Sequence, residues 1–266
     1  MMRDRLIFAG QLLFTLLVAA FLIVPAALSM LAGVTANYFR GISSGFTLQW
    51  IVQVWDLYAD TIGRSFLIAG ATLVVTLFIG IPAAYALHVR GGRMARAIEE
   101  IITLPLAIPG LAIALALLLT YNGFSDFRRS WLFILAGHVV FTLPFMVRSV
   151  MAIFSAIDVK TLDESASSLG ASPLRRFLDV IVPNARPGIL AGSLMVVTLS
   201  LGEFNLTWML HTPLTKTLPV GLADSYASMR LEVASAYTLV FFVMIIPLLI
   251  AMQMFASWGE AGGARK

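Results

Sequence analysis

The chain has 266 residues, of which 59% are hydrophobic and 12% are charged, whereas soluble domains carry roughly 25% charged residues. Together with several apolar runs of about twenty residues, this composition predicts an all-α membrane protein that crosses the bilayer several times and excludes a separate soluble domain. The net charge is +4 and cysteine is absent, so disulfides, thiolate metal sites and cysteine nucleophiles are excluded.

Motifs that would mark an enzyme or a cofactor site are missing. The sequence has no phosphate-binding loop of the Gly-x-x-x-x-Gly-Lys-Ser/Thr type, no His-Glu-x-x-His and no Gly-x-Gly-x-x-Gly. Its three histidines, His88, His138 and His211, have no ligand-like spacing. We therefore expect no catalytic residue, cofactor or metal, and if ATP drives this protein, another chain must bind it. In a membrane protein the basic residues are more simply topology determinants than nucleic-acid contacts.

The first 60 residues are expected to form one spanning helix and an outer loop. Residues 6–34 are apolar over a longer run than the roughly 7–15 residues of a signal-peptide core, which predicts an uncleaved span. Residues 35–61 are mixed, and their aromatic residues, Trp50, Trp55 and Tyr58, are typical of a membrane interface. We expect an outer loop here, with a surface helix.

Residues 61–258 are expected to form a core of five further spans. A polar turn is expected at 88–100, Pro105 and Pro109 break the start of the third span, and polar loops are expected at 121–130 and 211–230. His138 in the fourth span is expected to hydrogen-bond to a neighbouring helix. The six predicted spans are residues 6–34, 64–88, 101–120, 131–153, 187–210 and 231–258, followed by a tail at 259–266.

The basic residues predict the orientation in the membrane. If both termini lie inside, twelve Lys and Arg residues fall on the inner side and six on the outer side. The excess of positive charge on cytoplasmic segments then places both termini, and the polar residues 161–183, in the cytoplasm.

Residues 161–183 are the longest polar interval between the apolar runs, and they predict two short helices with a break between them. Thr161 and Glu164 fit a capping box at the first helix start. Gly170 suits the left-handed position after a helix end. Ser172 and Pro173 fit the N-cap and first position of a second helix.

One apolar stripe is expected on the second of these helices. Leu174, Phe177 and Leu178 are spaced so that they share a helix face, and Leu174 and Phe177 are our candidate anchors for a partner protein. The alternative is that they pack against this chain's own spanning helices.

The same interval carries a resemblance. Glu164-Ser165-Ala166, then Gly170, then Val180-x-Val182-Pro183 resembles the "EAA" loop of permeases of bacterial ATP-binding-cassette importers of type I. The chain departs from that pattern at residues 165, 180 and 182, all mild changes. The resemblance extends over about residues 61–258 and leaves only the first span and outer loop uncovered. Residues 201–204, Leu-Gly-Glu-Phe, resemble the polyamine, ferric iron and aminophosphonate permeases.

The resemblance implies a function and partners. It implies half of a translocation pathway in the bacterial inner membrane, surrounded by lipid and completed by a second permease subunit, identical or related. A cytoplasmic ATPase dimer and an extracytoplasmic solute-binding protein would complete the importer, which works by alternating access. Residues 161–183 would sit in a groove of the ATPase, and the expected coupling residues are Glu164, Ala166, Gly170, Leu174, Phe177 and Pro183.

Glu203 is the one acidic residue deep in a predicted span. A charge at the bilayer centre costs about 2.5–3.5 kcal/mol on insertion scales, so Glu203 should face the bundle interior or a wet path. With Asn205, Thr207 and Trp208 it forms our candidate pathway site, suited to a cationic or amine-bearing solute. The alternative is a gating or packing residue that never touches solute.

A second class of function is a secondary transporter driven by an ion gradient. It would require paired inverted repeats with broken helices and several ionisable residues within the membrane. The sequence shows one deep acid and no convincing repeat.

Overall fold

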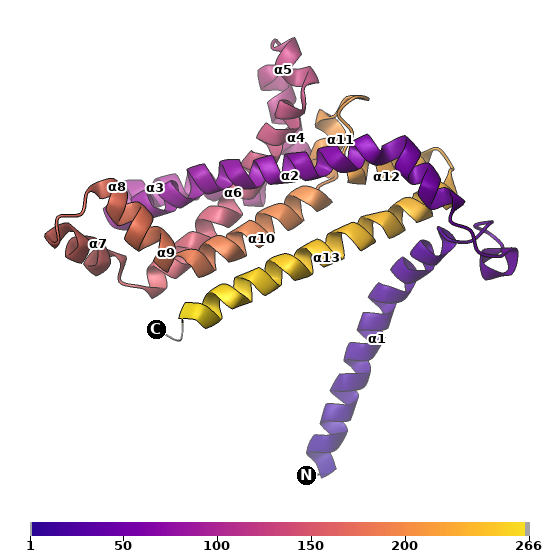
Figure 1. The fold of residues 1–266 in the computed structure, drawn as a ribbon, viewed down its shortest axis with the longest axis horizontal. Helices are drawn as coiled ribbons and strands as arrows, with labels where there is room; N and C mark the ends of the chain where they lie inside the picture. Colours follow the sequence, from indigo (N-terminus) through magenta and orange to yellow (C-terminus); the bar gives the residue numbers. More distant parts are fainter. Residues whose placement is uncertain (1, 264–266) are drawn as a thin grey trace. The chain divides into compact units, whose positions relative to one another are not determined.

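The computed structural model describes residues 2–263, with side chains at residue 5 and residues 7–254. Within this range the chain is helical, without a named strand, which confirms the predicted fold class (Figure 1). The elements are α1 (Met2–Ala32), η1 (Gly41–Ser44), α2 (Gln49–Arg90), α3 (Gly92–Thr103), η2 (Leu104–Ala107), α4 (Gly110–Tyr121), α5 (Ser125–Arg129), α6 (Trp131–Ala156), α7 (Val159–Ser168), α8 (Pro173–Arg175), η3 (Arg176–Ile181), α9 (Val182–Asn184), α10 (Arg186–Gly202), α11 (Asn205–Leu210), α12 (Leu218–Ala227) and α13 (Leu231–Gly263).

Four described helices are long and apolar enough to cross a membrane: Ile7–Ala32 of α1, the 42-residue α2, the 26-residue α6 and Leu231–Met254 of α13. Two bent pairs also qualify, Gly92–Ala107 with Gly110–Tyr121 at 108° and Pro173–Asn184 with Arg186–Gly202 at 74°. If each bent pair is one crossing, the total is the predicted six. Of the predicted tail, 264–266 lie outside the described residues.

The outer loop predicted at 35–61 is shorter in the structure, because a helix begins at Gln49. Its second half belongs to α2, which begins at Gln49 and continues through the predicted second span to Arg90. Residues 49–61 contain neither proline nor glycine, so nothing in the backbone ends the helix there. The fall in hydrophobicity indicates a membrane boundary, and the helix simply continues past it.

Two segments predicted to be polar turns or loops are largely helical. The turn expected at 88–100 is confined to Gly91 and Gly92, whose φ angles are +57° and +80°, and α3 follows with Ala95 buried and its arginines exposed. The loop expected at 211–230 contains α12, with Pro219 in its first turn, a position that proline tolerates. In α3 the charged residues of an amphipathic helix concealed its buried face, whereas the prolines and polar residues in and beside α12 indicated a loop.

The described chain divides into two compact units, Met1–Ala59 with Leu222–Ile245, and Asp60–Gly221 with Ile246–Lys266. In the first unit, the Glu232 carboxylate accepts a hydrogen bond from the Tyr38 N–H at 3.0 Å. The Tyr58 hydroxyl accepts one from the buried Ser225 hydroxyl at 3.0 Å. These bonds tie the outer loop and the start of α2 to the segment around the start of α13.

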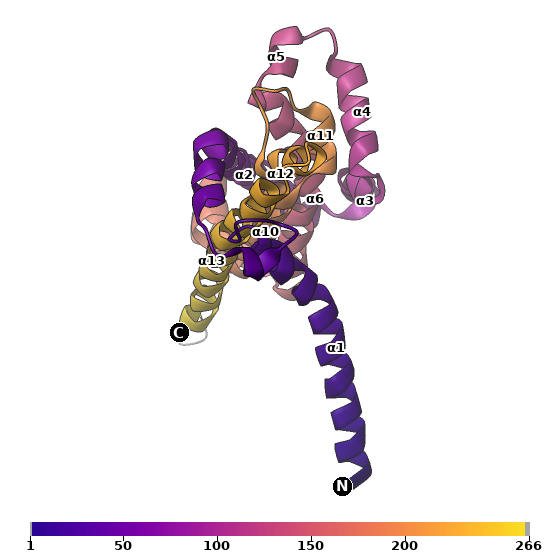
Figure 2. The same cartoon turned by 90° about the vertical axis from the view of Figure 1, so that its right-hand side faces the viewer.

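In the second unit, α6 and α10 lie side by side (Figures 1 and 2). Gly188 and Gly192 allow the close approach, because a Cβ on Gly188 would lie 2.6 Å from the Ser149 carbonyl oxygen and one on Gly192 would lie 2.8 Å from the Met146 sulfur. Small residues four apart are a common device for packing helices in membranes, where van der Waals contact replaces the hydrophobic effect.

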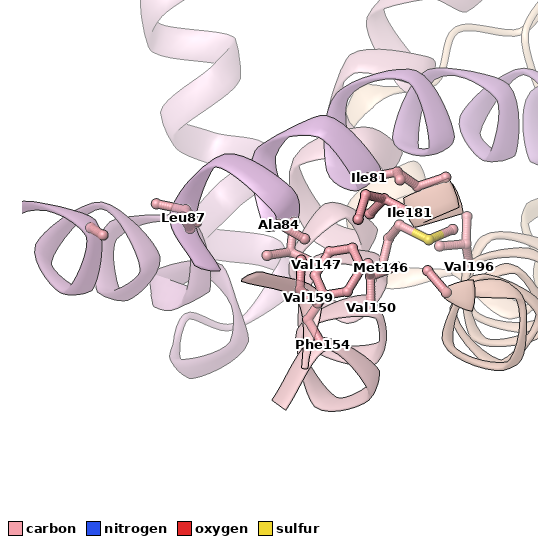
Figure 3. Packing of buried hydrophobic residues seen from close by; sticks show 12 residues of the cluster. Ile81, Ala84, Leu87, Met146, Val147, Val150, Phe154, Val159, Ile181 and Val196 are labelled. Carbon is pink, nitrogen blue, oxygen red and sulfur yellow. The ribbon is translucent and has the colours of Figure 1, made fainter. Parts of the chain in front are cut away.

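A buried apolar cluster connects the polar interval 161–183 to the spans. Figure 3 shows side chains from α2, α6, α7, η3 and α10 pointing toward one another. Phe154 of α6, Val159 of α7 and Ile181 of η3 are each at most 1% exposed. The two short helices therefore have a fixed position on the end of the second unit.

Candidate functional site

Helix α7 begins one turn earlier than the sequence predicts. Its N-cap is Asp158, whose carboxylate accepts hydrogen bonds from the Thr161 N–H at 3.1 Å and from the Thr161 hydroxyl at 2.6 Å. The predicted capping box of Thr161 and Glu164 is wrong, because Asp158 already occupies the capping position. The Glu164 side chain is consequently 65% exposed, with the Lys160 ammonium 3.8 Å away.

The break between the two helices has the predicted geometry. Gly170 has a φ of +81°. Its N–H bonds to the Ser167 carbonyl at 2.9 Å and the Ala171 N–H bonds to the Ala166 carbonyl at 3.1 Å, the pair of bonds that defines a Schellman motif. The Ser172 hydroxyl accepts from the Arg175 N–H at 3.5 Å, so Ser172 caps the second helix as predicted.

Two residues that the sequence analysis did not single out hold the helices together. The Asp163 carboxylate in α7 accepts from the Arg176 guanidinium in η3 at 3.0 Å and from the Tyr85 hydroxyl in α2 at 2.9 Å. The side chains of Arg176 and Asp163 are only 20% and 17% exposed. The signal in the sequence was present, since an Asp and an Arg flank Gly170 with opposite charges.

The predicted apolar stripe divides into an outward and an inward part. Leu174 and Leu178 are 66% and 50% exposed, whereas Phe177 is half-buried and its ring centroid lies 5.3 Å from that of Tyr85. The turn at Arg176–Ile181 is π-helical, and its wider spacing rotates Phe177 away from the two leucines. Of the two candidate anchors, Leu174 faces outward and Phe177 packs on this chain's own helix.

The two remaining residues of the predicted loop site are less exposed than Leu174. Ala166 is 8% exposed and Pro183 is partly exposed. The exposed residues of the helix pair include five with large apolar or charged side chains, Glu164, Leu169, Leu174, Arg175 and Leu178. We call these five residues the outward face.

The second acidic position, Glu203, lies at a break in the chain. The helix predicted at 187–210 is interrupted, because α10 ends at Gly202 and α11 begins at Asn205. Glu203 is 9% exposed. Its carboxylate accepts from the Leu206 N–H, the Thr207 N–H and the Thr207 hydroxyl, each at 2.8 Å.

His138 joins this group, and the expectation of an inter-helix hydrogen bond is confirmed. Its Nδ1 lies 2.7 Å from the Ser200 hydroxyl in α10 and its Nε2 lies 2.8 Å from the Thr207 hydroxyl in α11. Thr207 is fully buried, whereas Asn205 and Trp208 are exposed. The structure therefore separates the predicted pathway residues, with Glu203 and Thr207 facing inward and Asn205 and Trp208 facing outward.

Long apolar helices with a folded polar helix pair attached to the second unit describe a polytopic membrane protein. The family model of the binding-protein-dependent transport system inner membrane component matches residues 76–258. The chain belongs to this family, and it is a permease subunit of an ATP-binding-cassette importer.

Relatives with different named solutes resemble this chain. A Salmonella choleraesuis protein named as a 2-aminoethylphosphonate transport system permease, PhnV, is 26% identical over 94% of this chain and 95% of its own length. The molybdenum transport system permease ModB of Azotobacter vinelandii is 28% identical over 71% and 89%. The putrescine permease PotI of Escherichia coli is 26% identical over 79% and 77%.

Solved structures show the same fold. A chain of a bacterial ATP-binding-cassette transporter involved in import of the acidic polysaccharide alginate matches with a TM-score of 0.72 at 17% identity, over 96% of both chains. A chain of the methionine transporter MetNI, in an inward-facing conformation, matches with a TM-score of 0.59 at 16% identity, over 80% of this chain and 96% of that one.

Proposed function

We propose that residues 161–183 are the element through which an ATPase subunit drives this permease, and that the outward face is the surface it binds. The observation that carries the proposal is the outward face itself. Three leucines, Leu169, Leu174 and Leu178, are at least half exposed on this helix pair. Exposed apolar side chains rimmed by charge are typical of a protein interface.

Each part of the outward face has a role in the docking we propose. Leu174 and Leu178 would enter an apolar groove of the ATPase and supply the affinity. Glu164 would exchange its exposed contact with Lys160, 3.8 Å away, for a basic group of the partner. An exposed pair at that distance stabilises the isolated chain little, so the exchange costs little.

The wider assembly follows from family membership. In this proposal the chain forms half of the pathway with a second permease subunit, and a cytoplasmic ATPase dimer and an extracytoplasmic binding protein complete the importer. ATP binding would close the ATPase dimer and move the helix pair with it. The rigid attachment through Asp163, Arg176 and Tyr85 would pass this movement to α2. Family membership also favours this mechanism over the ion-gradient alternative.

A co-purification experiment tests the docking proposal. The chain, tagged and extracted in mild detergent, is expected to bring an ATP-binding-cassette ATPase with it at a stoichiometric ratio. Leu174→Asp is expected to lose that ATPase, while Leu214→Asp is a control for an added acid on an exposed leucine between α11 and α12, outside the outward face. Equal recovery of the ATPase by both variants would remove the outward face from the interface.

For the solute, we propose a small charged molecule of the aminophosphonate class, with polyamines and ferric iron as the other classes that the sequence suggests. The support is the length over which the aminoethylphosphonate relative matches and an aromatic row on the exposed side of α11. The Trp208 ring lies 5.4 Å from that of Phe204 and 5.5 Å from that of His211. An aromatic face attracts an amine through cation–π contact.

Uptake into proteoliposomes distinguishes the solute classes. The complex with its ATPase and binding protein is expected to accumulate 2-aminoethylphosphonate in an ATP-dependent manner. It should import putrescine, molybdate or ferric iron more slowly or not at all. Preference for molybdate, the solute class of the Azotobacter relative, would contradict the aminophosphonate proposal and leave the importer proposal intact.

For topology, we propose both termini on the cytoplasmic side of a bacterial inner membrane. Because the chain has no cysteine, single cysteines are clean probes. Cysteines at the exposed positions Ser43, Ser125 and Ser228 should react with an impermeant maleimide from outside, and one at Ser168 should not. Ser225 is unsuitable because it is 1% exposed. Labelling at Ser168 in intact cells would reverse the orientation.

A further inference from the structure

A chain of hydrogen bonds connects three helices to Glu203 in the interior of the second unit. Ser200 of α10, His138 of α6 and Thr207 of α11 are at most 5% exposed, and Glu203 itself is 9% exposed. Successive contacts are 2.7 Å from Ser200 to His138, 2.8 Å from His138 to Thr207 and 2.8 Å from Thr207 to the Glu203 carboxylate. Short contacts at every link, in a site shielded from water, form a network whose bonds strengthen one another.

The direction of donation along this chain follows from the number of protons available. The Thr207 hydroxyl has one proton, which it donates to Glu203 Oε2. Its oxygen must then accept from His138, which places a proton on Nε2 of the imidazole. Nδ1 is therefore the acceptor and Ser200 donates to it. Each group donates toward Glu203, and the carboxylate is where the chain ends.

The carboxylate also caps α11. It accepts from the backbone N–H groups of Leu206 and Thr207, both at 2.8 Å, which a helix start within a membrane would otherwise leave without partners. With the Thr207 hydroxyl, three donors converge on the two oxygens of Glu203. A glutamine amide would direct its own N–H groups at one of these donors, so the site requires a group that only accepts.

The opposite side of α11 is open. Leu206 and Leu210 pack against α6, where a Cβ on Gly137 would lie 2.6 and 2.7 Å from their side chains, whereas Asn205 and Trp208 are exposed. Because α11 has only six residues, it cannot hold a helical conformation without such contacts.

We infer that Glu203 is a positioning residue for the solute pathway: it holds α11 in place through its cap and through Thr207, His138 and Ser200, and it does not bind the solute. The inference rests on the proposed function only in taking Asn205 and Trp208 as the pathway surface. The sequence left open a packing role for Glu203, and the inference assigns it that role, since three donors from α11 already bond to its two oxygens.

The test places a spin label on α11. In the cysteine-free chain, Asn205→Cys provides one labelling site on the exposed side. Glu203→Gln and Thr207→Val are then introduced singly and together. Thr198→Val is the matched control, because the Thr198 hydroxyl in α10 is exposed and bonds only within its own helix, to the Leu194 carbonyl at 2.7 Å.

We expect the label to become more mobile in Glu203→Gln and in Thr207→Val and to remain unchanged in Thr198→Val. In the unlabelled chains, maximal solute uptake should fall at least about tenfold for Glu203→Gln, the loss expected from a charge-assisted bond, with an unchanged half-saturating solute concentration. The double variant should be no worse than Glu203→Gln alone, because both substitutions break the same network.

The opposite results overturn the inference. If Glu203 binds solute, Glu203→Gln will raise the half-saturating concentration, Thr207→Val will not, and the label will keep its mobility. Because label mobility needs no transport, it tests the network even if the complex fails to import any solute, which would count against the proposed function alone. If Glu203→Gln does not fold, Thr207→Val, which removes only one hydroxyl, still tests the inference through the mobility of the spin label.

Discussion

Two acidic residues, Glu164 and Glu203, show how differently two polar breaks in this chain are built. Both stood out in the sequence, one in the polar interval and one deep in a predicted span. The Glu164 side chain is 65% exposed, with one long contact to Lys160. Glu203 is 9% exposed and accepts three bonds of 2.8 Å. The Glu164 carboxylate is therefore largely exposed, whereas the Glu203 carboxylate is hydrogen-bonded within its own chain.

The comparison also shows which residues stabilise the helix pair. Asp163, next to Glu164 in the sequence, makes the contacts to Arg176 and Tyr85. Adjacent residues on a helix point about 100° apart, so one acid faces inward and the other outward. In the docking we propose, the inward acid would contribute stability and the outward acid would contribute recognition.

The largest effect is expected from breaking the inward contact. Asp163→Asn leaves the Arg176 guanidinium mostly buried without its counter-charge, which typically costs about 3 kcal/mol. We expect faster proteolysis at residues 161–183 and loss of the co-purifying ATPase. Glu164→Gln is the control and should leave the proteolysis rate unchanged. If the two variants are cleaved equally fast, Asp163 is not what holds the helices together.

A somewhat smaller effect is expected at the apolar stripe of Leu174, Phe177 and Leu178. Phe177→Ala removes a half-buried ring packed on Tyr85. Because Phe→Ala at a fully buried site costs about 3–5 kcal/mol of stability, we expect a loss of about 2 kcal/mol here. Leu174→Ala, at 66% exposure, should stay within about 0.5 kcal/mol of the parent. Thermal unfolding in detergent measures the difference. A larger loss for Leu174→Ala would mean that Leu174, not Phe177, faces inward.

The next effect concerns the break itself. Gly170 has a φ of +81°, and a Cβ there would meet no atom within 4 Å, so the cost of Gly170→Val comes from backbone strain without a clash. That strain is about 1–2 kcal/mol, and it should reduce ATPase recovery by reshaping the outward face. Gly170→Asn is the control, since asparagine tolerates left-handed conformations. Equal recovery from Val and Asn variants would show that docking does not depend on this turn.

The smallest effect is a pH dependence at the N-cap of α7. Hydrogen bonds from the Thr161 hydroxyl and N–H hold the pKa of Asp158 below its ordinary value of 3.8. A carboxyl with a lowered pKa in the folded state stabilises it above that ordinary value, and the contribution disappears as the pH falls through the folded pKa. Asp158→Ala should therefore lower the melting temperature slightly at pH 7 and less at pH 3. A constant difference between the two pH values would argue against the cap.

The sequence by itself determined the fold class, most of the spans and the helix–Gly–helix at 161–183. These features depend on local properties: apolar runs long enough for a bilayer, a glycine where the backbone turns left-handed, and Ser172-Pro173 at a helix start. His138 was also placed correctly, because a buried imidazole in a span has to find partners on other helices.

Only the tertiary structure decided which polar side chains face inward. The π-helical turn rotated Phe177 away from Leu174, and the break after Gly202 turned Glu203 into a cap for α11. Neither follows from residue spacing, because spacing assigns faces on an unbroken helix. In the structure both irregular turns pack against helices that are distant in the sequence, Phe177 against Tyr85 of α2 and Leu206 against Gly137 of α6. The Asp158 cap is different, because it is a local contact with Thr161.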